Sequence, residues 1–310
     1  LALLGLAARE QPHSSLNVDK ASPATSVAGA DSRRASTAPA SLHEFESALS
    51  QLVQRRFPSL RSVLISPSFV VYTCLTLAGM LRLALLLVQL GPMLHYHFSG
   101  RLDSDATIER LSGLASLCFL TSLVFSPACG CLVDRLRKAW LPPLLPLSFA
   151  VSSPQLHLRS LAASTDPRPT QLASAVYWLS LTPLLPPAIA SALLATLVSA
   201  LCFFPSLPGF YALLLSLAAM RSCLYTFSLA YLISAFPLEM YGRVYAAFSF
   251  IYGLVALLQY SVLRLSVPTA NIICLFLAVS MFAPPFYMGV QSWRSWGQLV
   301  AWQRTLGNSG

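Results

Sequence analysis

Two arginines inside long apolar runs are the residues of this sequence best suited to bind a charged ligand. Arg82 and Arg221 each lie in a run of predominantly apolar residues that contains no Asp or Glu. A guanidinium stays charged at physiological pH and holds a carboxylate through two parallel hydrogen bonds. Either arginine can therefore bind the carboxylate of a small ligand. The alternative is a structural arginine that bonds backbone carbonyls or a carboxylate elsewhere.

Other polar side chains accompany both arginines at helical spacing. Tyr72, Thr76, Gly79, Arg82 and Gln89 fall on one side of a helix, as residues three and four apart do. Tyr225 and Ser228 follow Arg221 in the same way, and Gln259 lies in a later apolar run. The predicted ligand-binding residues are Arg221, Tyr225, Arg82, Tyr72, Gln89 and Gln259. Of the two arginines, we expect Arg221 to bind the ligand and Arg82 to be chiefly structural.

The apolar runs lack the side chains that intramembrane enzymes use. Such enzymes need paired aspartates, a His-Glu-x-x-His helix or a nucleophile with a buried base, and the runs contain no Asp, Glu or His. The seven cysteines all lie inside these runs, where cysteine behaves as a small apolar residue. Cys129 and Cys131 have no further residues at metal-ligand spacing. The sequence therefore predicts no catalytic residue, metal or cofactor.

Composition places these runs in a membrane. Of the 310 residues, 55% are hydrophobic and 10% are charged, and the mean hydropathy is +0.65. Soluble domains carry about a quarter charged residues. The net charge of +9 comes from residues spread between apolar runs, without the basic stripe of a nucleic-acid binder. The predicted fold is an all-α integral membrane protein that binds no nucleic acid.

Six runs are long enough to cross a bilayer of about 30 Å as helices. They lie near residues 69–91, 111–133, 184–205, 209–236, 244–265 and 269–290. Fifteen of the twenty Lys and Arg residues fall on one predicted side and three on the other. Because basic residues concentrate in cytoplasmic loops, both ends of the chain are predicted to be cytoplasmic.

The segments outside these runs are polar. Residues 1–8 are expected to be the end of a truncated earlier helix, and residues 9–68 a cytoplasmic loop. Within that loop, residues 41–56 have the spacing of an amphipathic helix, which can lie on the membrane surface or against the helix bundle. Residues 139–183 are rich in Pro and Ser, which indicates an insertion or an error in the gene model. Residues 291–310 are predicted to be a cytoplasmic tail.

A charged motif ends the second apolar run. It consists of Gly130, Asp134, Arg135, Arg137 and Lys138. The glycine permits close helix approach, Asp134 can face a helix N-terminus, and the basic residues can pair with acidic groups or lipid headgroups. Any helix that ends at the cytoplasm also tends to carry Arg and Lys, so this simpler explanation stays open.

The motif resembles the cytoplasmic loop signature of the major facilitator superfamily, and other stretches resemble solute carrier family 43 and its apicomplexan relatives. Those stretches are Leu81-Arg82, Val133-Asp134-Arg135, Arg221-Ser222, Leu224-Tyr225, Ala235-Phe236-Pro237, Gly242-Arg243 and Leu257-Leu258-Gln259-Tyr260. Thr226 departs from the pattern, since the family tends to have Gly there. The resemblance implies that residues 69–290 are the C-terminal half, helices 7–12, of a twelve-helix transporter whose N-terminal half is missing.

The resemblance also implies a function. Members of that family carry large neutral or cationic amino acids by facilitated alternating access, with the substrate between the two halves, in the plasma membrane. We therefore expect a small-molecule substrate, an amino acid by preference, and as partners the bilayer and the missing half. A nucleobase or other small organic solute is an alternative substrate. A non-transporting membrane receptor or partner protein is an alternative of another class.

Overall fold

The computed structural model describes residues 42–98, 104–140, 168–204 and 206–307, all of them within one compact unit. The described residues form α-helices and two short 3-10 helices, with no strand among them. Six stretches of helix are long and apolar enough to cross a membrane, and this confirms the predicted number. The spans, in chain order, are Pro67–Phe98, Glu109–Trp140, Ala173–Leu201, Leu207–Ala235, Leu238–Val262 and Val267–Ala301.

Three spans consist of one helix each. They are α3 (Pro67–Phe98), α4 (Ser104–Trp140) and α9 (Leu207–Ala235). The first two run past the predicted apolar cores because polar and charged residues at their ends, such as Glu109 and Lys138, favour helix as well as apolar residues do. Ser206 caps the start of α9 by accepting a hydrogen bond from the Gly209 N–H.

The other three spans are interrupted. The third consists of α7 (Arg168–Ser180), the 3-10 helix η2 (Thr182–Leu184) and α8 (Leu185–Leu201). The fifth consists of η3 (Leu238–Met240), α10 (Tyr241–Ala256) and α11 (Leu258–Leu263), and the sixth of α12 (Val267–Ser280) and α13 (Ala283–Gly307). Prolines begin several of these pieces. Pro183, Pro186, Pro284 and Pro285 lack the N–H that a continuous helix would need.

The structure differs from the predicted boundaries at two segments. Residues 168–183, which we assigned to the insertion, form α7, one turn residue and the start of η2, and from Ala173 onward they belong to the third span. Residues 141–167 of that segment lie outside the described residues. Residues 291–307 of the predicted tail are helical and continue α13. The two segments pack against each other, and the Thr182 and Ser292 hydroxyls lie 3.1 Å apart. Each therefore covers apolar surface that the other would expose.

The predicted amphipathic helix is α1 (Leu42–Arg56), and it lies against the bundle. Leu49, Val53 and Phe57 are buried in the same core as the spans. The Arg56 guanidinium lies 4.3 Å from the ring centroid of Tyr177 on α7. A short helix, α2 (Leu60–Leu64), then leads into α3.

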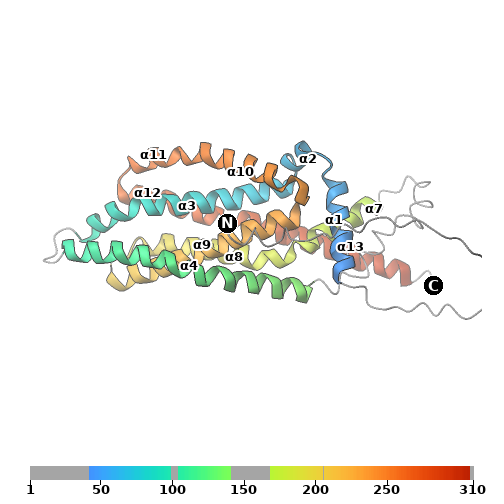
Figure 1. Ribbon diagram of the computed structural model, residues 1–310, viewed down its shortest axis with the longest axis horizontal. Coiled ribbons are helices and arrows are strands. Elements are labelled where there is room, and N and C mark those ends of the chain that lie inside the picture. The colour runs from blue at the N-terminus through green and yellow to red at the C-terminus, as the bar shows by residue number, and fades with distance from the viewer. Residues whose placement is uncertain (1–41, 99–103, 141–167, 205, 308–310) are drawn as a thin grey trace, which may run out of the picture. The chain divides into compact units, whose positions relative to one another are not determined.

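The helix contacts repeat between the first three spans and the last three. The first and fourth spans form an inner pair, in which α3 packs against α9. The third and sixth spans form an outer pair, in which α8 packs against α12. The first span packs along α12, and the fourth span packs along α8. At the two edges, α4 lies on α9, while α10 and α11 lie on α3 (Figure 1). If the first, second and third spans are matched with the fourth, fifth and sixth in that order, each of these contacts corresponds to an equivalent contact in the matched set.

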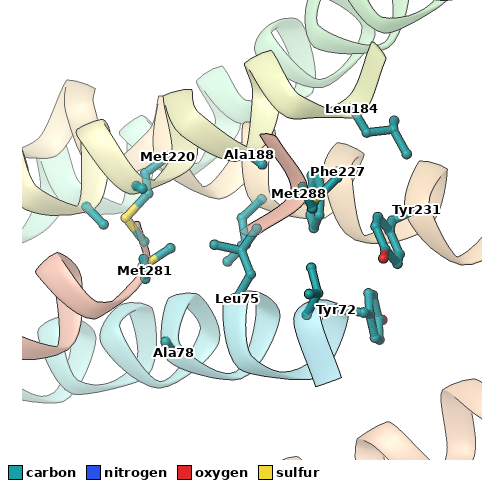
Figure 2. Close-up of a cluster of buried hydrophobic side chains, with 14 of the residues drawn as sticks. Tyr72, Leu75, Ala78, Leu184, Ala188, Met220, Phe227, Tyr231, Met281 and Met288 are labelled. Carbon is teal, nitrogen blue, oxygen red and sulfur yellow. The ribbon is translucent and has the colours of Figure 1, made fainter. Parts of the chain in front are cut away.

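The core lies where α3, α8, α9 and the last span meet. Figure 2 shows Tyr72, Leu75 and Ala78 of α3 facing Met220, Phe227 and Tyr231 of α9, with Met281 and Met288 between them. A Cβ atom added to Gly79 would lie 2.7 Å from both terminal methyl carbons of Leu224 and 3.1 Å from a Met281 methyl. The absence of a side chain at Gly79 thus sets how closely α3 approaches α9.

Replacing Gly79 with Val tests this contact. The new side chain must displace Leu224 in a buried site, and overpacking of this kind destabilises proteins by about 1–3 kcal/mol. We expect the purified Gly79→Val protein in detergent to melt at a lower temperature than the wild type. Gly91→Val is the matched control, because Gly91 lies on the same helix with nothing within 4 Å of an added Cβ. Equal melting temperatures for the two variants would contradict the close contact.

Candidate functional site

Arg82 is fully enclosed by this bundle. Its side chain is 1% exposed and projects from α3 toward α8 and α12. Its Nε donates to the Ser199 Oγ at 2.8 Å, and its Nη2 donates to the Cys202 Sγ at 3.6 Å. Its Nη1 is buried without a hydrogen-bond partner among the described residues. Of the residues that the structure describes, no carboxylate forms an ion pair with this guanidinium.

Further polar groups complete a buried Arg82 cluster, which we define as Arg82, Gln89, Ser199, Cys202 and Cys274. The Ser199 hydroxyl donates to the Ala195 carbonyl at 2.9 Å, so its lone pairs stay available to Arg82. Cys274, on α12, is 4.0 Å from the Gln89 Oε1. The cluster links α3, the C-terminal end of α8, and α12, which belong to the first, third and sixth spans. The two hydrogen-bond partners of Arg82 among the described residues lie in the same six-span unit.

Tyr72 is likewise bonded within the bundle. Its hydroxyl is 3.0 Å from the Ser228 Oγ, and its ring stacks on Tyr231 with centroids 5.8 Å apart. Tyr231 in turn donates to the Ser68 carbonyl at 3.1 Å. The polar stripe predicted on α3 is therefore buried along its length, inside this six-span unit. Its buried members are Tyr72, Thr76, Gly79, Arg82 and Gln89.

Arg221 and Tyr225 of α9 are less buried than the polar residues of α3. Tyr225 is 40% exposed, and the Arg221 guanidinium carbon lies 5.7 Å from its ring centroid. This is a cation–π pair between residues four apart on one helix. Ser228, which was predicted to share their stripe, is instead buried and bonded to Tyr72. Gln259 is half-buried on α11, which packs against α3.

The charged motif borders a cavity of about 200 Å³ at one end of the bundle. Asp134 and Arg137 of α4 line it, together with Ser180 of α7 and Ser234 of α9. Arg135 and Lys138 are exposed on the surface beside it. A Cβ added to Gly130 would meet nothing within 4 Å. Among the residues that the structure describes, no helix therefore approaches Gly130 closely enough to require a glycine there.

Comparison with known proteins adds nothing to this geometry. No family model matches the sequence, and no curated protein or solved structure shows significant similarity to it. The part of the chain that the structure describes is all-helical and contains six stretches long and apolar enough to cross a membrane, as in a multi-pass membrane protein.

Sequence reasoning missed Ser199 and Cys202, the hydrogen-bond partners of Arg82. Both lie in an apolar run, three residues apart, and so on one face of α8. That spacing is a usable signal, since small polar residues in membrane helices often bond across helices. It does not say which of the other helices they face.

Removing the Ser199 hydroxyl tests the Arg82 cluster. Ser199→Ala leaves the buried Nε of Arg82 without its acceptor, and an unsatisfied buried donor costs about 1–3 kcal/mol. We expect the variant to melt at a lower temperature in detergent. Ser280→Ala is the control, because Ser280 is exposed and its hydroxyl bonds only its own helix, at the Leu277 carbonyl. A Ser199→Ala protein as stable as the control would show that this hydrogen bond contributes nothing.

Proposed function

We propose that this chain is one six-helix half of a twelve-helix carrier of the major facilitator superfamily, which moves amino acids across the membrane by facilitated alternating access. The supporting observation is the repeated contact pattern, in which spans one to three and spans four to six make equivalent contacts. Two three-helix units of opposite orientation are the building plan of such carrier halves. The family assignment rests on this pattern together with the sequence resemblance.

The second half, on this proposal, packs against the two edge spans. Both are poorly covered: only 6% of the apolar window in α4 and 11% of that in the fifth span is buried within this unit. Large apolar side chains project from both. On α4 they are Leu117, Leu120, Val124 and Leu132, and on α10 they are Tyr245, Phe250 and Leu254. Lipid can also cover such faces, so they support the proposal without deciding it.

Arg221 is the group that we propose binds the substrate carboxylate. It is half-buried beside an exposed tyrosine, and a ligand can reach this side of α9 from outside the six-span unit. Arg82 is a poorer candidate, because two of its nitrogens bond Ser199 and Cys202 inside the bundle. The substrate class is an amino acid, large neutral or cationic.

An Arg221→Lys variant of the full carrier tests this assignment. Lysine keeps the charge but loses the planar fork that holds a carboxylate through two hydrogen bonds. We expect the apparent affinity for amino acids to fall about tenfold, as the loss of about 1.4 kcal/mol implies, at an unchanged surface level. Arg264→Lys, at an exposed position after α11, is the control and should transport normally. Unchanged affinity at normal surface level would overturn the role of Arg221.

Flux measurements separate the proposal from its alternatives. Purified carrier in liposomes should exchange radiolabelled amino acids without a steep dependence on a pH gradient, since the apolar cores of the spans contain no carboxylate to carry a proton. Flux of nucleobases alone would favour the other substrate class, and no flux of either would favour a receptor or partner protein. We place the protein in the plasma membrane with both ends of this chain in the cytoplasm, which tags of known membrane side can test.

A further inference from the structure

Two cysteine thiols from different spans meet between α4 and α9. The Sγ atoms of Cys129 and Cys223 lie 3.4 Å apart, and both side chains are half-buried. All seven cysteines are free thiols. The contact was not foreseen from the sequence, in which 93 residues separate the two positions. It joins one helix of the first three spans to one helix of the last three.

The backbones of α4 and α9 run close together at this level. Beside Cys223, the Ser222 hydroxyl lies 3.4 Å from the Ser122 carbonyl of α4, within hydrogen-bond distance across the helix pair. A disulfide has an S–S length of about 2.05 Å. The two sulfurs must therefore approach by about 1.4 Å for the bond to form.

A cavity lies within two helical turns of these thiols. Val133 follows Cys129 by one helical turn and Ala230 follows Cys223 by two, so each pair shares a helix face. Val133 and Ala230 both line the cavity of about 200 Å³ that Asp134 and Arg137 border. That cavity lies along the α4–α9 contact and ends beside exposed charges. A hydroperoxide that enters from the aqueous side therefore comes within two turns of the sulfurs.

We propose that Cys129 and Cys223 form a redox-active dithiol, which a hydroperoxide converts into a disulfide between α4 and α9. One thiol reduces the O–O bond, becomes a sulfenic acid and releases water or an alcohol. The second thiol then attacks the sulfenic sulfur, the S–S bond forms, and a second water leaves with the remaining proton. Two molecules of a cytosolic thiol such as glutathione reverse the bond by exchange. The resting state in a reducing cytoplasm is the dithiol.

Counting reactive thiols in the full protein tests the dithiol. After hydrogen peroxide treatment in membranes and denaturation, a mass-tagging maleimide should label two fewer cysteines than in the untreated protein, and a reductant should restore them. The Cys223→Ser and Cys129→Ser proteins should lose this paired protection. Cys118→Ser, a half-buried cysteine of the same α4, should keep it. Full labelling of the oxidised wild type, or protection that survives in Cys223→Ser, would overturn the proposal.

A second reagent covers the case in which a serine variant folds poorly. A trivalent organic arsenoxide bridges two adjacent thiols with loss of one water and needs no oxidant. It should protect the same two cysteines in the untreated wild-type protein, and subsequent peroxide should then protect no further pair. An arsenoxide that leaves both cysteines reactive to the maleimide would also overturn the proposal, because such thiols are not close enough to be bridged.

Measuring flux tests whether the disulfide affects transport, and this test rests on the proposed function. If the chain belongs to a carrier whose α4 and α9 must shift against each other, peroxide should lower flux at least severalfold in the wild type and leave Cys223→Ser unaffected. Disulfide formation without a change in flux would contradict the coupling of α4 and α9 in transport, and would leave the dithiol itself established.

Discussion

The approach of α3 to α9 is the contact on which the remaining helices depend. Each of these two helices supports one edge span, α4 on α9 and α10–α11 on α3, and each packs along one of the two outer spans. Gly79 makes this approach possible because the Leu224 side chain occupies the space in which any larger residue would project. A larger side chain at position 79 would therefore have to displace Leu224 or separate the two helices.

Polar side chains fix the register of these helices in a way that apolar packing alone would not. A guanidinium in a water-free interior is costly wherever it lacks partners. Arg82 therefore favours the one arrangement that brings Ser199 and Cys202 of the third span to its level. Tyr72 and Tyr231 do the same between α3 and α9, through Ser228 and a backbone carbonyl. Because the bonded groups come from different spans, sliding any one of them breaks a bond that the apolar interior cannot replace.

Hydropathy was enough to predict the number of spans, since a bilayer demands long apolar helices whatever their function. It could not predict which way a polar stripe faces. The polar stripe through Arg82 must face away from lipid. It can do so by lining a substrate cavity or by packing against another helix. In the structure it packs against other helices. Residues 168–183 were misassigned because Pro and Ser are typical of loops, although proline is also common in the first turn of a helix. The partners of Arg82 and the Cys129–Cys223 pair are more than 90 residues apart in sequence, where one sequence offers no pairing signal.

The two outer spans are broken at different heights, and this affects how they can bend. The third span is interrupted at η2, beside the continuous part of α13, where Thr182 meets Ser292. The sixth is interrupted at Met281, which lies against the unbroken middle of α3 near Gly79. At each break, a continuous helix packs alongside the interrupted span and supports it. Bending at either break would therefore require the adjacent continuous helix to bend or to separate from the interrupted span.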